Sequence, residues 1–254
     1  MLWILLFILI FGRSESLTMI PKFDKRVKKY VEVEAKKKEI LASIKAFKKE
    51  KKAHQKGEKK FLKHFAANSL ARNTPLEFFE ISFEKMYADQ NKFDQISVEE
   101  RLKIQKLLKE DEWQNILKAT EKGLKKEQKN NQKALKKLNK VIEKIKKSIA
   151  KELPDSKKKE QAISIANQLQ TDINKEVNAF FKINYLENDT LRNINATEAE
   201  IQEVVDKMSA IRTNIFDAFV KARFEMVNAT TEQEWNSIVK SINKLLKLFV
   251  KADN

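Results

Sequence analysis

The sequence predicts an all-α protein, an elongated helical bundle, on three observations. The chain of 254 residues contains only 3 Gly and 3 Pro, far fewer than turn-rich β architectures require. Lys, Glu, Leu, Ile and Ala dominate the composition, as is typical of long helices. Apolar residues recur at steps of three and four, which is the period of an amphipathic helix. The 16 Phe supply enough apolar surface for a folded core.

The N-terminus has the pattern of a secretory signal. Leu2–Phe11 is an unbroken apolar run that ends at Gly12, and Ser14 and Ser16 follow at the spacing of a cleavage site. We therefore expect a signal peptide over residues 1–16 and a secreted protein. Ten apolar residues span about 15 Å as a helix, half of a hydrocarbon core of about 30 Å. The alternatives are an uncleaved segment that anchors the protein to a membrane and a buried N-terminal helix.

Two lysine-rich segments, 22–66 and 117–152, predict the longest helices. Pro21 suits the start of the first helix because proline has a helical φ and no N–H to lose there, and Pro154 ends the second. In both segments the apolar phase is interrupted near the middle by polar residues. We therefore expect the two helices to form an antiparallel coiled-coil-like pair about 55 Å long.

The matched phases of these two segments select one register. It places Phe47 beside Leu138, so that apolar residues meet along the seam. It also places His54 opposite Asn131, so that the two polar gaps meet each other. A polar residue in such a seam fixes the register at a cost in stability. The alternative is a splayed, solvated middle.

The rest of the chain predicts shorter helices. Within 67–116 we expect one helix rich in Phe over Glu77–Phe93 and a second that starts at a capping box at Ser97. Thr197 and Thr231 are each followed three residues later by Glu, which marks two further N-terminal caps. The remaining helices are expected near 157–186, 196–227 and 231–251.

These expectations divide the chain into three parts. The first is the signal peptide over 1–16. The second is a long helical hairpin over 17–153, with the inserted helices at 67–116. The third is a helical bundle over 154–254.

Two internal echoes occur at different offsets. Phe78–Phe83 resembles Phe180–Tyr185 at an offset of 102 residues. The pattern that begins at Arg101 and continues through Glu112-Trp113 recurs from Arg223 through Glu234-Trp235, at an offset of 122. Since the offsets differ, no single duplication explains both. Repeated aromatic residues at helical spacing are typical of core positions.

The net charge of +16 is concentrated in two segments. Residues 22–66 carry 17 basic and 6 acidic side chains, and residues 118–152 carry 13 Lys and 4 Glu, whereas the remainder sums to −4. An anionic partner would meet these two segments. The alternative interpretation is a solvated helix face. The candidate polyanion-binding residues are the densest cluster: Lys48, Lys49, Lys51, Lys52, Lys56, Lys59 and Lys60.

The residue inventory argues against catalysis and against a cofactor or metal site. The chain has no Cys, which excludes thiol chemistry, and too few Gly for a phosphate-binding loop. His54 and His64 are ten residues apart and do not share a helix face as a zinc-binding pair would. Lysines without interleaved aromatic residues do not favour specific nucleic-acid recognition. We expect a protein that is not an enzyme.

Three sequons for N-glycosylation occur in segments that we expect to lie between helices. They begin at Asn188, Asn195 and Asn228. In a secreted protein these three asparagines are candidate glycan attachment sites.

Two stretches of the C-terminal half form a recognisable pattern: Phe180-Phe181-Lys182-Ile183, and NATEAEI from Asn195 through Ile201. Together they resemble the nematode SXP/RAL domain. Ala196 stands where the family has Leu, and Met208-Ser209 stands where it has Trp-Ala. The resemblance covers about 30 residues. It implies secretion, an all-helical fold and cation binding, but no ligand set can be assigned to residues of this chain.

A second stretch, Ala229-Thr230-Thr231-Glu232-Gln233, is similar to the Leu-Thr-Pro-Glu-Gln motif of the periplasmic Spy/CpxP-like chaperones. That resemblance implies a basic helical binder of unfolded chains or a sensor of envelope stress. No Lys or Arg precedes the apolar run of the signal, which favours a eukaryotic secretory route over a periplasmic one. Our hypothesis is a secreted helical binding protein that acts on a protein or an anionic surface. A periplasmic chaperone and a structural coiled-coil spacer are the alternatives.

Overall fold

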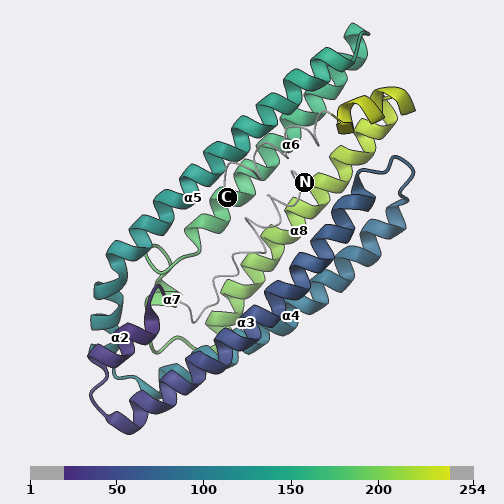
Figure 1. Ribbon diagram of the computed structural model, residues 1–254. Coiled ribbons are helices and arrows are strands. Elements are labelled where there is room, and N and C mark those ends of the chain that lie inside the picture. Colours follow the sequence, from purple (N-terminus) through teal and green to yellow (C-terminus); the bar gives the residue numbers. More distant parts are fainter. Residues whose placement is uncertain (1–19, 241–254) are drawn as a thin grey trace.

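The computed structural model describes residues 20–240, and every regular element in that range is a helix, which confirms the all-α prediction. The molecule is elongated, with its long helices running side by side (Figure 1). Across the figure the order is α5, α6, α8, α3 and α4, and α2 closes one end. The helices are α2 (Phe23–Tyr30), α3 (Glu34–Ser69), α4 (Leu76–Leu107), α5 (Glu110–Glu152), α6 (Ser156–Lys182), α7 (Asp189–Arg192), α8 (Glu198–Ala229) and a helix over 232–240.

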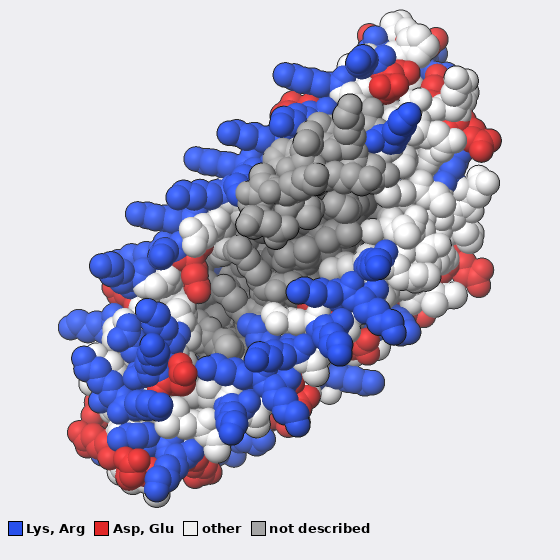
Figure 2. Space-filling model, in the orientation of Figure 1, with Lys and Arg blue, Asp and Glu red and all other residues white. Residues whose placement is uncertain are grey.

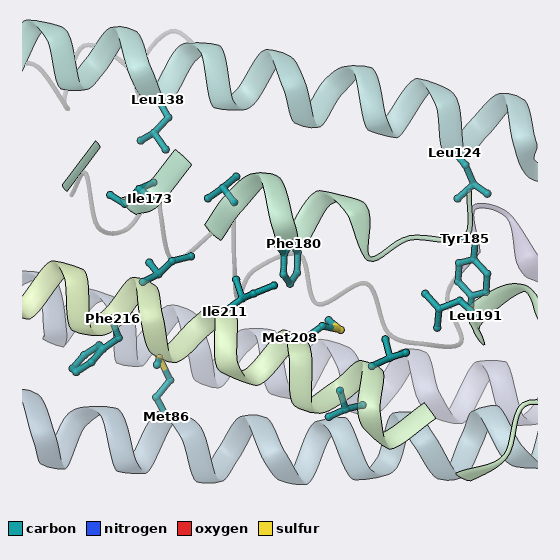
Figure 3. Packing of buried hydrophobic residues seen from close by; sticks show 14 of the residues in the cluster. Met86, Leu124, Leu138, Ile173, Phe180, Tyr185, Leu191, Met208, Ile211 and Phe216 are labelled. Carbon is teal, nitrogen blue, oxygen red and sulfur yellow. The ribbon is translucent and has the colours of Figure 1, made fainter. Parts of the chain in front are cut away.

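The helices form two antiparallel hairpins with α8 between them. α3 packs on α4, α5 packs on α6, and α8 packs on both α6 and α4. One apolar cluster extends through these contacts from Ile20 to Ile238. Figure 3 shows its central part, where Phe180 of α6 points toward α8 and Met86 of α4 reaches toward α8 from the other side. This burial of apolar side chains is the main favourable contribution to folding.

Several predicted helix boundaries are confirmed. Thr197 and Glu200 form a reciprocal capping box at the start of α8. Thr231 and Glu234 exchange the same two hydrogen bonds at the start of the 232–240 helix. α5 ends at Glu152, two residues before Pro154. Each of these signals involves residues within a few positions of one another, and each marks a helix end in the structure. The predicted signal peptide, and the predicted helix beyond residue 240, lie outside the described residues.

The predicted short helix and second capping box within 67–116 are wrong. α4 runs without interruption from Leu76 to Leu107, and Ser97 lies buried in its middle. The Ser97 hydroxyl donates to the carbonyl of Phe93, one turn earlier, at 2.9 Å. A serine hydroxyl can be satisfied in this way inside a helix, so Ser97 does not mark a helix start.

The predicted pairing of 22–66 with 117–152 is not confirmed. The first segment is broken at 31–33 into α2 and α3, of which α2 packs on α5 and α3 packs on α4. Phe47 therefore contacts Phe93 of α4, with ring centroids 5.5 Å apart. His54 stacks on the same Phe93 at 4.5 Å, rather than meeting Asn131. α3 therefore packs on α4, the helix that follows it directly in the chain, rather than on the more distant α5.

The offset of 122 residues seen in the sequence describes the fold. α4 and α8 match from end to end at this offset, and so do the starts of α3 and α6. The last turns of α5, which end at Glu152, correspond to α2, which ends at Tyr30. The described chain therefore contains two structural repeats, residues 22–118 and residues 144–240. The echo at an offset of 102 is not part of this relation, because Phe78 lies at the start of α4 and Phe180 near the end of α6.

Each repeat holds the other by the same device. Arg101 donates to the carbonyls of Leu191 and Asn193 at 3.1 and 3.0 Å, and Trp113 Nε1 donates to Arg192 O between them at 2.6 Å. We call this arrangement the first clamp. Arg101 also lies over the Trp113 ring, 4.3 Å from its centroid.

The second clamp repeats these contacts 122 residues later. Arg223 donates to Ser69 O and Ala71 O at 3.0 and 2.6 Å, and Trp235 Nε1 donates to Leu70 O at 3.0 Å. Burial lowers the pKa of Arg223 to about 10, which still leaves it charged at neutral pH. Each buried guanidinium thus satisfies carbonyls at a helix end and directly after it, which would otherwise be left unpaired.

Candidate functional site

The seven predicted lysines all lie on α3. Five of them are exposed: Lys49, Lys52, Lys56, Lys59 and Lys60. The other two, Lys48 and Lys51, are half-buried, so they contribute less to the outer surface. Lys48, one of these two, forms an ion pair with Asp24 of α2 at 3.3 Å. Burial alone would raise the pKa of Asp24, but the hydrogen bond and charge of Lys48 lower it.

Six of the exposed lysines of α3 follow one face of the helix. Their steps alternate between three and four residues, so successive ammonium groups lie one above the other on the same side. We call this the α3 lysine face. It consists of Lys45, Lys49, Lys52, Lys56, Lys59 and Lys63, all of which are exposed.

A longer row of the same kind covers the outer side of α5. From Lys118 to Lys151 it extends about 50 Å at 1.5 Å per residue. Figure 2 shows it as a row of projecting basic side chains along the edge of the molecule that α5 occupies in Figure 1. We call this the α5 lysine face. It consists of Lys118, Lys122, Lys125, Lys129, Lys133, Lys136, Lys140, Lys144, Lys147 and Lys151, all of which are exposed.

Few carboxylates lie among these ammonium groups. On α5, Glu121 pairs with Lys125 at 3.5 Å and Glu143 pairs with Lys146 at 2.7 Å. The hydrogen bond from Lys146 lowers the pKa of Glu143, and the charge of Lys147 adds to this. Like charges at i, i+4 repel each other, so each lysine face is an unfavourable arrangement that a bound anion would relieve.

Sequence reasoning identified the charge of the α5 segment but not its individual residues. The signal was available, because the steps of three and four are visible in the sequence itself. The α3 residues were predicted because lysines are closely spaced there in the sequence. Such a cluster also includes Lys48, which pairs with α2 instead of lying on the lysine face. A search by helical period would have found both faces.

The three predicted glycosylation sites lie at helix ends. The Asn188 side chain caps α7 by accepting from Leu191 N at 3.0 Å. Asn195 is exposed in the loop that precedes α8. Asn228 is exposed but lies in the last turn of α8, rather than between helices as predicted.

Within residues 20–240, no cluster of three or more His, Asp or Glu side chains is placed to hold a metal ion. The same range contains no helix that is both long enough and apolar enough to cross a membrane. Of the two histidines, His64 is exposed on α3. His54 is half-buried against α4.

Comparisons with known proteins return no family model, no curated protein and no solved structure that matches this chain. The function must therefore be argued from the geometry alone.

Proposed function

We propose that this is a secreted, non-enzymatic helical binding protein whose α3 and α5 lysine faces bind an extended polyanion. The observation that carries the proposal is the regular spacing of exposed lysines along both faces. A stripe of ammonium groups about 50 Å long presents positive charge along a line rather than at one point, which suits an extended polyanion. Lysine acts as a flexible point charge, which suits binding without sequence preference.

Electrostatics gives this proposal a characteristic signature. Binding would be driven by release of the counterions that surround the polymer, so it would weaken steeply with salt. Six or more contacts predict a loss of about a thousandfold in affinity between about 50 and 200 mM salt. Heparin titrations followed by calorimetry at these two concentrations measure that loss.

Two sets of substitutions test the faces separately. Replacing Lys49, Lys52, Lys56 and Lys59 with Gln removes the centre of the α3 face, and replacing Lys125, Lys129, Lys133 and Lys136 removes the centre of the α5 face. Gln and Lys have similar helix propensity, so helix content measured by circular dichroism should not change. We expect each set to weaken heparin binding at least tenfold at low salt.

A matched control keeps the change in net charge and alters only its place. Lys157, Lys182, Lys207 and Lys221 are exposed and lie on neither face. Their replacement with Gln should weaken binding much less than either set above. Equal effects of all three sets, or binding that does not depend on salt, would show that the faces only keep the protein soluble.

Secretion is a separate part of the proposal and has its own test. The apolar run of Leu2–Phe11 and the Ser14–Ser16 spacing support cleavage after Ser16. The intact mass of the protein recovered from its native compartment measures this. A mature chain that begins at Met1 would instead support an anchored protein.

A further inference from the structure

A cavity of about 300 Å³ lies between the middles of α3 and α4. His54, Gly57 and Glu58 of α3 form one wall, and Met86, Gln90 and Phe93 of α4 form the other. Cavities of this size are at the lower end of those that hold small organic ligands. The cavity coincides with the polar gap in the apolar phase of α3, so it lies where the two helices are not sealed by apolar contacts.

The walls carry a chain of polar contacts that leads from the cavity into the core. His54 Nε2 lies 3.3 Å from Glu58 Oε1 and 3.1 Å from Gln90 Oε1. Gln90 Nε2 donates to Asp94 Oδ1 at 2.8 Å, and Arg212 Nη1 of α8 donates to Asp94 Oδ2 at 2.8 Å. Glu58 is 11% exposed at its side chain and stands at the cavity end of this chain. The network fixes His54 and Gln90, and so gives the cavity defined walls.

The second repeat provides an internal comparison. At the offset of 122 residues, Glu58 corresponds to Phe180, Asp89 to Ile211 and Asp94 to Phe216. These three apolar side chains belong to the apolar core, where Figure 3 shows Phe180 directed toward α8. The same scaffold is therefore filled in one repeat and hollow and polar in the other.

Gly57 adds to the space on the α3 side. A Cβ atom at this position would meet no atom within 4 Å. The corresponding residue of the second repeat is Ala179, which packs against the core. Glycine in the middle of a helix costs about 1 kcal/mol relative to alanine. The cavity is thus bordered by a residue that is unfavourable for the helix and fills no space.

The charge of the lining is opposite to that of the protein. Glu50, Glu58 and Asp89 border the cavity together with one lysine, Lys92, and His54. In a chain of net charge +16, a concave site with more carboxylates than ammonium groups favours a cation. Phe61, Phe93 and Met86 give it apolar and aromatic walls.

From these observations we propose that the α3–α4 cavity binds a small organic cation, a protonated amine with an apolar or aromatic body. The ammonium group pairs with the Glu58 carboxylate in a half-enclosed site, where a charge-assisted hydrogen bond is stronger than in water. The body of the ligand lies against Phe61, Met86 and Phe93. Phe61 offers it an aromatic ring, since one face of Phe93 is covered by His54. This site is independent of the lysine faces, which lie on the outer sides of their helices.

A titration with 2-phenylethylammonium tests the proposal, with binding followed by two-dimensional NMR of the full chain. We expect saturable shifts at residues of α3 and α4 around the cavity, with a Kd of about 0.1 to 1 mM for a ligand of this size. The neutral analogue 2-phenylethanol and the anion 3-phenylpropionate should bind at least tenfold more weakly. Equal or tighter binding of either analogue would overturn the assignment of charge.

Two variants test the residues. Glu58→Gln keeps the size of the side chain and removes its charge, and we expect at least tenfold weaker binding of the amine. Gly57→Leu adds a side chain at the border of the cavity, where a Cβ atom meets nothing within 4 Å, and should weaken binding strongly without lowering the melting temperature. Glu203→Gln removes an exposed carboxylate of α8 and should leave binding unchanged. Undiminished binding in Gly57→Leu, or no saturable binding by the wild type up to about 10 mM, would overturn the proposal.

Discussion

The two structural repeats agree at their ends and differ in their middles. At the ends, Arg101 with Trp113 and Arg223 with Trp235 each donate to three consecutive carbonyls at a helix end of the other repeat. In the middles, the second repeat is filled by Phe180, whereas the first has the charged residue Glu58 at that position.

The helices that surround the middle of each repeat explain this difference. α6 and α8 pack on each other, and they also pack on α5 and α4 respectively, so the middle of the second repeat is enclosed. An unpaired charge there would be buried without water, at a cost of several kcal/mol. Arg212, a buried charge of α8, has Asp94 of α4 as a partner. α3 packs mainly on α4 and α2, which leaves its outer side to solvent. Polar residues can therefore occupy the interior side of its middle, and a cavity is tolerated.

The largest expected effect tests the equivalence of the two clamps. Trp113 and Trp235 are both buried, and each donates its indole N–H to a backbone carbonyl at a helix end. Trp113→Ala and Trp235→Ala should each lower the free energy of unfolding by about 3–5 kcal/mol. Chemical denaturation followed by far-UV circular dichroism measures both. A cost below about 1 kcal/mol for only one of them would show that the clamps are not equivalent.

A second prediction concerns the ion pair that joins the repeats through their middles. Asp94 is the described carboxylate that accepts from Arg212 at 2.8 Å, and Arg212 is 1% exposed. Asp94→Ala removes a charged partner of a buried guanidinium and should cost about 3 kcal/mol. The double variant Asp94→Leu with Arg212→Met makes this contact apolar, as Phe216 already does at the position equivalent to Asp94. It should recover most of the loss, and a double variant that is less stable than Asp94→Ala would contradict the interpretation.

Gly57 and Gly123 offer a smaller comparison between two helix interiors. Gly57→Ala should raise the free energy of unfolding by about 1 kcal/mol, because alanine is the better helix former and its Cβ meets nothing within 4 Å. At Gly123 the added Cβ would lie 3.4 Å from Pro21 Cβ, so part of that gain depends on a small movement of Pro21. Thermal unfolding of the two variants measures the difference. A Gly57→Ala variant that is less stable than the wild type would show that the added methyl group clashes with a neighbouring residue.

The smallest expected effect is a pH dependence of the free energy of unfolding that comes from His54 in the first repeat. Burial lowers the pKa of His54, but the hydrogen bond and charge of Glu58, together with Gln90 and Asp94, outweigh burial and raise it above 6.5. Because the folded pKa is raised, protonated His54 stabilises the fold below pH about 6.5, and this contribution is lost as pH rises through the folded pKa. Glu50, Glu58, Asp89, Lys92, Asp94 and Arg212 are the other charged groups around this site.

The difference in stability between the wild type and His54→Gln should therefore be larger at pH about 5.5 than at pH about 8. Urea denaturation at the two pH values measures this difference. His64→Gln, which replaces an exposed histidine of the same helix, controls for effects outside the cavity. A difference that grows toward high pH would show that the neutral form of His54 is the one the fold favours.

Local chemistry was readable in the sequence wherever one residue type decides the outcome. The capping boxes at Thr197 and Thr231 and the helix end before Pro154 follow from side chains and backbone in direct contact. The break at 31–33 corresponds to the one at 153–155 at the offset of 122 residues, but it contains no proline and no glycine, and no local pattern marks it. It is held by a distant residue, since Glu112 accepts from Glu32 N at 3.0 Å.

By itself, the sequence determined the all-α class, the helix ends marked by Thr197, Thr231 and Pro154, and the concentration of charge on two segments, because propensity, capping and composition act within a few residues. Only the tertiary structure decided which helices pair, since apolar phases show that a helix has a partner but not which one. It also decided that the offset of 122 residues is the structural one and that the polar gap at His54 borders a cavity. Both depend on residues far apart in the chain, whose contacts are selected by the packing of the whole molecule.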